Sequence, residues 1–129
     1  MWDDFAEYIL SETENKNVKI AEIAVGKFDR IADYLASKDN IDLIKTDIAP
    51  KDETVIKDDI TNPNMDLYKD RDIIYSIRPP SELQPYIVKL AVEIGSHLII
   101  KPLTNEDLNT GNAKMKLKNF KRASFYTLR

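Results

Sequence analysis

Two cations stand directly before prolines, each at the end of a short apolar run. Arg78 precedes a Pro-Pro pair and Lys101 precedes a single proline. Proline disfavours the helical conformation in the residue before it, so we expect both cations on extended backbone. Neighbouring strands lie about 4.8 Å apart, so both side chains would reach one anion, such as a carboxylate or phosphate. The alternative is that each cation pairs with a nearby carboxylate, such as Glu82 or Glu106.

Residues suited to a nucleotide also follow apolar runs. Gly26 and Lys27 follow the run 18–25, and Asp47 comes 21 residues after Gly26. An acid about 20 residues after a glycine turn is typical of the ribose ligand in a nucleotide-binding βαβ unit. Asp47 could instead cap its own turn. Asp58 and Asp59 follow the run 54–57, and they are either further ligand contacts or a solvated loop.

Neither a complete dinucleotide fingerprint nor a zinc set is present in the sequence. The fingerprint has three glycines in G-x-G-x-x-G, whereas this chain has Ala24, Gly26 and Asp29 in that register. Nicotinamide redox chemistry is therefore poorly supported. His97 is the single histidine and there is no cysteine, so the usual zinc ligands and disulfides are excluded and we expect His97 to be structural.

The spacing of apolar residues predicts the elements that carry these side chains. Apolar residues at helical spacing predict helices over 2–9, 28–35 and 82–94, with Ser81 as the N-cap of the last and Gly95 at its end. Five apolar runs predict strands over 18–25, 41–46, 54–57, 72–77 and 97–100. Residues 114–118 alternate Lys with other side chains and predict an antiparallel hairpin with 123–128.

Strands that alternate with helices predict an α/β domain with a parallel sheet over residues 1–129. The expected strand order is 3-2-1-4-5, with the hairpin on the strand-5 edge. Ligands of such sheets bind at the carboxyl ends of the strands where the order reverses, here between strands 1 and 4. The connections after strands 2, 3 and 5 are short, which leaves one face thinly covered and favours a partner or a homodimer.

The 129-residue composition is that of a globular protein, with 43% hydrophobic and 32% charged residues. No apolar run approaches the roughly 18 residues of a membrane span, and the first residues are acidic, unlike a signal peptide. We therefore expect a cytoplasmic protein that does not bind a membrane.

Basic residues are concentrated at the C-terminal end. Residues 113–129 contain six basic residues and no acidic one, whereas the preceding 112 hold 13 basic and 22 acidic residues, a net charge of −9. Such a segment either binds RNA or an acidic protein, or forms a solvated strand face. The candidate contacts are Lys114, Lys116, Lys118, Lys121 and Arg122.

The segments "EIAVGKFDRIADYL", "TDIAP", "VIKDDI", "IYSIRPPSELQ" and "LIIKPL" together resemble uncharacterised protein family 0146, an archaeal family, over nearly the whole chain. The resemblance implies a Rossmann-like three-layer sandwich, similar in layout to a truncated S-adenosylmethionine-dependent methyltransferase. No activity comes with the family, so whether the chain is an enzyme stays open.

The methyltransferase likeness assigns roles to several acids. Glu22 and Gly26 match the first motif of these methyltransferases, an acid followed by alternating glycines. Asp47 matches the acid that holds the ribose, and Asp58 or Asp59 matches the acid near the adenine. The resemblance therefore implies S-adenosylmethionine or a nucleotide as the ligand.

Two departures argue against a methyltransferase, and the second argues against an amine as its target. Phe28 replaces the last glycine of the first motif, and Arg78 stands where amino-group methyltransferases carry the Asn or Asp of their N/D-P-P-aromatic motif. We expect a binding protein for an adenosyl or nucleotide ligand. The alternatives are a small or partner-dependent methyltransferase and an interaction domain that uses the basic hairpin, in which Phe120, Phe125 and Tyr126 would stack bases.

Overall fold

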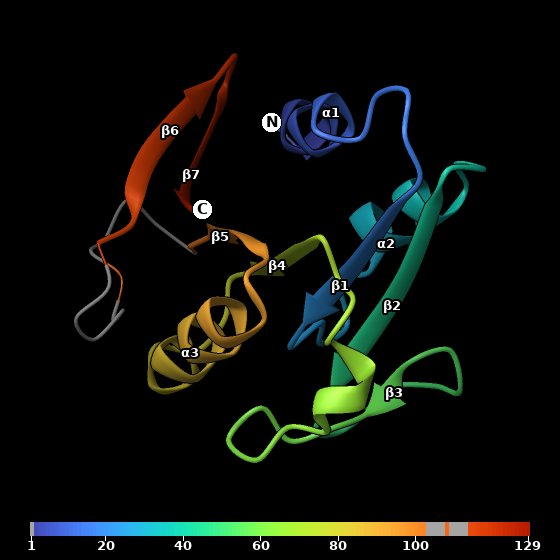
Figure 1. Ribbon diagram of the computed structural model, residues 1–129, viewed down its shortest axis with the longest axis vertical. Helices are drawn as coiled ribbons and strands as arrows, with labels where there is room; N and C mark the ends of the chain where they lie inside the picture. The colour runs from blue at the N-terminus through green and yellow to red at the C-terminus, as the bar shows by residue number, and fades with distance from the viewer. Residues whose placement is uncertain (1, 103–107, 109–113) are drawn as a thin grey trace.

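A seven-stranded sheet runs through the computed structural model in the order β3-β2-β1-β4-β5-β7-β6 (Figure 1). The structure describes residues 2–102, 108 and 114–129. The first five strands are parallel, and β7 pairs antiparallel with both β5 and β6. The predicted order and the hairpin at the β5 edge are confirmed. The strands are β1 (Val18–Ile23), β2 (Ile41–Asp47), β3 (Ile56–Lys57), β4 (Ile73–Ile77), β5 (His97–Lys101), β6 (Lys116–Phe120) and β7 (Ala123–Leu128).

Helices cover both faces of the sheet, which makes the fold an α/β, Rossmann-like three-layer sandwich. Helices α1 (Trp2–Ser11) and α2 (Arg30–Ala36) pack on one face, and α3 (Gln84–Ile94) packs on the other (Figure 1). All five residues of β4 and all five of β5 are buried, as expected of strands that are covered on both faces. No helix in the described part of the chain combines the length and the apolar character needed to cross a membrane.

An aromatic cluster fixes α1 on the sheet. The Phe5 ring is 0% exposed and makes edge-to-face contacts with Tyr75 of β4 and Phe125 of β7, at centroid distances of 6.2 and 5.3 Å. Such contacts add stability beyond the burial of apolar area. The cluster joins the N-terminal helix to the middle and to the C-terminal edge of the sheet.

The opposite face is covered by a helix only in part. α3 contacts β5, and the segment that connects β3 to β4 along the chain contains no α-helix. Ile60 and the fully buried Tyr68, beside the 3-10 helix η1 (Met65–Leu67), instead pack against β1 and β4 on that side. The expected thin coverage is thus made up by side chains of a loop. The homodimer remains a prediction.

The start of α3 differs from the prediction. Ser81 is not an α-helix N-cap: it begins the 3-10 helix η2 (Ser81–Leu83), and α3 starts at Gln84. Pro85 explains the shift, because a proline has no N–H to donate and fits only the first positions of an α-helix. At the other end Gly95 has φ 72° and ends α3, as predicted.

The second helix also begins later than predicted. α2 starts at Arg30 rather than at Phe28, and the Phe28 ring packs against Trp2 of α1 at a centroid distance of 4.8 Å. Phe28 thereby lies at the edge of the sheet instead of on the buried stripe of a helix.

Replacing Phe5 with alanine is expected to destabilise the protein by about 3–5 kcal/mol, because the cavity left between α1 and the sheet cannot refill. Urea unfolding measures the change. Val92→Ala is the matched control: Val92 is 61% exposed on α3, so its truncation should cost less than about 0.5 kcal/mol. Equal losses for the two variants would show that α1 does not pack as described.

Candidate functional site

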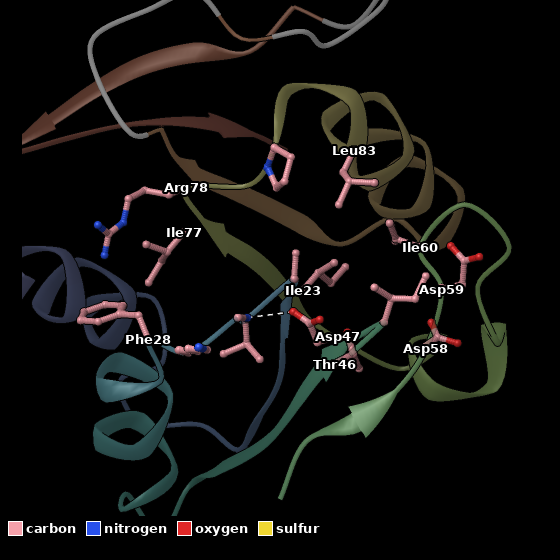
Figure 2. Close-up of a pocket in the computed structure, with 16 residues that line it drawn as sticks. Ile23, Phe28, Thr46, Asp47, Asp58, Asp59, Ile60, Ile77, Arg78 and Leu83 are labelled. Atoms are coloured by element: carbon pink, nitrogen blue, oxygen red, sulfur yellow. Dashed lines mark hydrogen bonds between the residues drawn. The ribbon is translucent and has the colours of Figure 1, made fainter. Parts of the chain in front are cut away.

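A cavity of about 380 Å³ opens at the carboxyl ends of β1, β2 and β4 (Figure 2). Its walls come from the turn after β1 (23–28), the end of β2 (46–48), the loop after β3 (58–60) and four residues after or at the end of β4, which are Ile77, Arg78, Pro80 and Leu83. Its size is that of a small-molecule site. It lies between β1 and β4, where the strand order reverses.

The turn after β1 borders the cavity with backbone in the left-handed conformation. Ala24 and Gly26 have φ of 56° and 59°, in the left-handed region that glycine tolerates best. A Cβ added at Gly26 would meet no atom within 4 Å, so space beside this glycine is open. The Val25 N–H donates to the Thr46 carbonyl at 3.2 Å and holds the turn against β2.

Asp47 is fixed by two backbone N–H groups. Its Oδ2 accepts from Gly26 at 2.8 Å, drawn as a dashed line in Figure 2, and its Oδ1 accepts from Ala49 at 2.9 Å. The residue therefore caps its own turn and also positions the glycine turn. Each carboxylate oxygen can accept about two hydrogen bonds, so both oxygens retain capacity for ligand hydroxyls.

Asp58 and Asp59 line the same cavity on the β3 side. The Tyr68 hydroxyl donates to Asp58 Oδ2 at 2.7 Å and lies 3.1 Å from Thr46 Oγ1. Asp59 Oδ1 accepts from the hydroxyl and the N–H of Thr61, and these bonds lower the pKa of Asp59. Both acids order their own loop while they border the cavity.

Arg78 lies at the opposite side of the cavity from these acids (Figure 2). Its φ of 53° corrects the expectation of extended backbone: the following proline disfavours the right-handed helical region, and the residue adopts the left-handed one instead. The guanidinium lies over the rings of Trp2 and Phe28, 5.2 Å from each centroid. The side chain therefore points toward α1, away from Asp47.

Lys101 adjoins Arg78, as the strand ends predicted, but it does not line the cavity. The Arg78 N–H donates to the Lys101 carbonyl at 2.6 Å, and Lys101 pairs with Ile77 in the β4–β5 register. The lysine is 9% exposed. Burial, together with the neighbouring charge of Arg78, lowers the pKa of Lys101. Glu82 makes no ion pair with either cation among the described residues, and Glu106 lies outside them.

The family model described as "Uncharacterised protein family (UPF0146)" matches residues 2–129. The chain belongs to this family. A UPF0146 protein of Methanothermobacter thermautotrophicus is 41% identical over 98% of this chain and 93% of its own. A UPF0146 protein of Methanocaldococcus jannaschii is 46% identical over 88% of this chain and 85% of its own.

Solved structures with the same fold include methyltransferases. A mutant of MtNAS has a TM-score of 0.62 at 12% identity and covers 97% of this chain, which spans 59% of that protein. The antibiotic-resistance methyltransferase Kmr has a TM-score of 0.60 at 7% identity, over 95% of this chain and 90% of its own. Magnesium protoporphyrin IX methyltransferase (ChlM) from Synechocystis PCC 6803, with bound SAM, has a TM-score of 0.57 at 12% identity, over 98% and 75%. At these identities the likeness shows the fold alone.

Glu22 lies away from the cavity in this UPF0146 chain, which corrects its expected contact with a ligand. Side chains alternate along β1, and Glu22 points to the face covered by α1 and α2, where it is 0% exposed. Neither carboxyl oxygen has a hydrogen-bond partner of good geometry among the described residues. Burial raises the pKa of Glu22 to about 8, although the nearby Tyr75 hydroxyl opposes the rise. Lys27, by contrast, lines the cavity.

The apolar walls of the cavity were not predicted. Ile48 is 59% exposed although it directly follows Asp47, and Ile60, Leu83 and Phe28 are among the other apolar residues of the lining. An isoleucine placed next to a candidate ribose acid was the one sequence signal available. Among the described residues no group of three or more metal-ligating side chains is arranged to hold an ion.

The basic hairpin is partly neutralised by α1. Lys121 pairs with Glu7 at 2.6 Å, and Arg122 Nε lies 3.3 Å from Asp4 Oδ2. Lys118 lies over the Tyr8 ring at 5.9 Å. Three of the five predicted contacts thus bind the protein itself, while Lys114 and Lys116 have no ion pair within the described ranges. Binding of RNA or a protein here remains a prediction.

Replacing Glu22 with glutamine is expected to flatten the pH dependence of stability. The pKa of Glu22 is higher in the folded than in the unfolded protein, so its contribution is complete below pH 4.5 and is lost as pH rises toward 8. Between those limits the free energy of unfolding should fall by up to about 1.4 kcal/mol per pH unit in the wild type relative to Glu22→Gln. Urea unfolding at several pH values measures this difference.

Glu93→Gln is the control for that series, because Glu93 is exposed on α3. Its unfolding free energy should differ from that of the wild type by a constant amount across the range. Parallel curves for Glu22→Gln and the wild type would contradict the burial of an uncompensated carboxyl group at residue 22.

Proposed function

We propose that this protein binds an adenosyl or nucleoside ligand in the cavity between β1 and β4. The observation that carries the proposal is the pairing of Asp47 with the open glycine turn: a carboxylate held by the Gly26 N–H at 2.8 Å faces a cavity with unobstructed backbone beside it. Ribose hydroxyls are donors that suit such a carboxylate.

The apolar walls suit the flat face of a base. Ile48 borders the cavity next to Asp47, and Ile60 and Leu83 line the cavity as well. An exposed isoleucine is costly in water and gains stability when an apolar or aromatic surface covers it. Asp58 and Asp59 border the same side, where their acceptor oxygens suit the exocyclic amino group of an adenine.

The fold supports the adenosyl class of ligand in particular. The structural neighbours include ChlM, which was solved with bound SAM. Open parallel sheets bind ligands where the strand order reverses, and the cavity of this protein lies at that point.

Methyl transfer is the second candidate function, and the observation that favours it is the methyltransferase fold. After β4, Arg78 occupies the place of the Asn or Asp with which amino-group methyltransferases accept a hydrogen bond from the target amine. An amino group is therefore an unsuitable methyl acceptor for this protein. Transfer of a labelled methyl group from S-adenosylmethionine to RNA or protein of a cell extract separates this candidate from binding alone. Retention of the whole label on the donor, with and without added extract proteins, argues for binding alone.

Adenosine, S-adenosylmethionine and S-adenosylhomocysteine are expected to perturb the backbone amides of residues 24–28, 47–48 and 58–60 in ¹H–¹⁵N spectra. Asp47→Asn should weaken the binding by roughly 10- to 150-fold, because charge-assisted hydrogen bonds contribute about 1.5–3 kcal/mol. Isothermal titration calorimetry measures the affinity, and thermal unfolding verifies that the variant is folded.

Asp66→Asn is the matched control, since it removes the same charge from an exposed side chain of η1 outside the cavity. Its affinity should equal that of the wild type. The proposal is overturned if no ligand perturbs these amides at millimolar concentration, or if the two variants weaken the binding equally.

A further inference from the structure

Arg78 and Lys101 form a pair of like charges that no carboxylate balances within the described residues. Their backbones are joined by the 2.6 Å bond from the Arg78 N–H to the Lys101 carbonyl. Lys101 has the same strand parity as Ile99, whose side chain packs in the core under α1, so the lysine also points to that face. Arg78 reaches the same side, over Trp2 of α1.

Two aromatic rings hold the Arg78 guanidinium in place. The Trp2 and Phe28 rings are tilted by 43° with centroids 4.8 Å apart, and the guanidinium carbon is 5.2 Å from each centroid. These are cation–π contacts, which leave the N–H groups of the guanidinium without a hydrogen-bond acceptor. A guanidinium carries five N–H donors, and among the described residues none of those of Arg78 has an acceptor. The donors are therefore oriented and available.

The acids nearest in sequence to Trp2 and Phe28, the two rings that form a platform for Arg78, are paired with other cations. Asp3 pairs with Arg30 at 3.5 Å, and Asp4 accepts from Arg122. Asp29 lies 2.6 Å from Lys51, with Lys45 as a second partner. Acids that could have balanced Arg78 thus have partners of their own.

Two further features single out this pair. Lys101 is 9% exposed, and its ammonium group has neither a hydrogen bond nor an ion pair in the described part of the chain, which is unfavourable for a cation unless an anion joins it. Arg78 holds a positive φ, which costs energy in a residue other than glycine, and such strained residues cluster at functional sites.

We propose that Arg78 and Lys101, backed by the Trp2–Phe28 platform, form an oxyanion site that binds the phosphate or carboxylate group of a ligand beside the strand-end cavity. The edge of the guanidinium offers two parallel donors that match either group, and Lys101 supplies a second charge. The site does not require a nucleoside in the cavity, so it can hold or fail independently of the function proposed above.

Titration of the full chain with inorganic phosphate, at constant ionic strength maintained with chloride, tests the site. We expect saturable shifts of the Arg78 Nε–Hε and Trp2 indole N–H signals in ¹H–¹⁵N spectra. Arg78→Gln and Lys101→Met should each weaken phosphate binding by about tenfold or more. The wild-type shifts themselves need no variant, so the test stands even if one substitution unfolds the protein.

Lys121→Gln is the matched control, because it removes one positive charge that Glu7 already balances on the hairpin. Its phosphate affinity should equal that of the wild type. The proposal is overturned if the Arg78 signal shows no saturable shift, or if Lys121→Gln weakens binding as much as the other two variants.

The source of the oxyanion is identified by two further titrations. Methyl phosphate and acetate, compared at equal concentration, distinguish a phosphate from a carboxylate. The stronger titration is then repeated with saturating adenosine. If the anion belongs to a second molecule, the anion and adenosine bind together. If it belongs to the tail of the cavity ligand, S-adenosylhomocysteine without added anion shifts the Arg78 signal and adenosine does not.

Discussion

The hydrogen bond from the Gly26 N–H to the Asp47 carboxylate connects the two strand ends on which the candidate site depends. The glycine turn leaves β1 in the left-handed conformation, and the acid at the end of β2 receives its N–H. Because Asp47 also accepts from Ala49, one carboxylate orders two turns. Together with the bond from the Val25 N–H to the Thr46 carbonyl, it holds the backbone beside the cavity against β2.

Charge is distributed unevenly around the cavity, and the acidic and basic side chains differ in whether they have partners within the protein. The acids on the β3 side are hydrogen-bonded to their own loop, as Asp58 is to Tyr68 and Asp59 to Thr61. The cations on the β4–β5 side rest on aromatic rings or inside the protein without a carboxylate among the described residues. The acidic side is thus satisfied without a ligand, whereas the basic side gains most from an added anion.

Much of the fold could be predicted because its strands are short apolar runs and its helices have regular apolar spacing. The strand order, the hairpin at the β5 edge and the Gly95 helix end follow from such local patterns. The start of α3 could not be placed correctly from Ser81, since Pro85 shifted it by two residues. Phe28 has helical spacing relative to Ile31 and Leu35, but it packs on Trp2, a contact between segments that no local pattern reports.

By itself the sequence determined which residues end the strands, and therefore that Gly26, Asp47, Asp58 and Arg78 would meet at one edge of a parallel sheet. Tertiary structure alone decided where their side chains point. Glu22 is turned into the core by the alternation of β1, and Lys101 is buried beside Arg78 rather than in the cavity. The physical reason is that strand ends are set by local chain chemistry, whereas side-chain direction depends on register and on packing partners distant in the sequence.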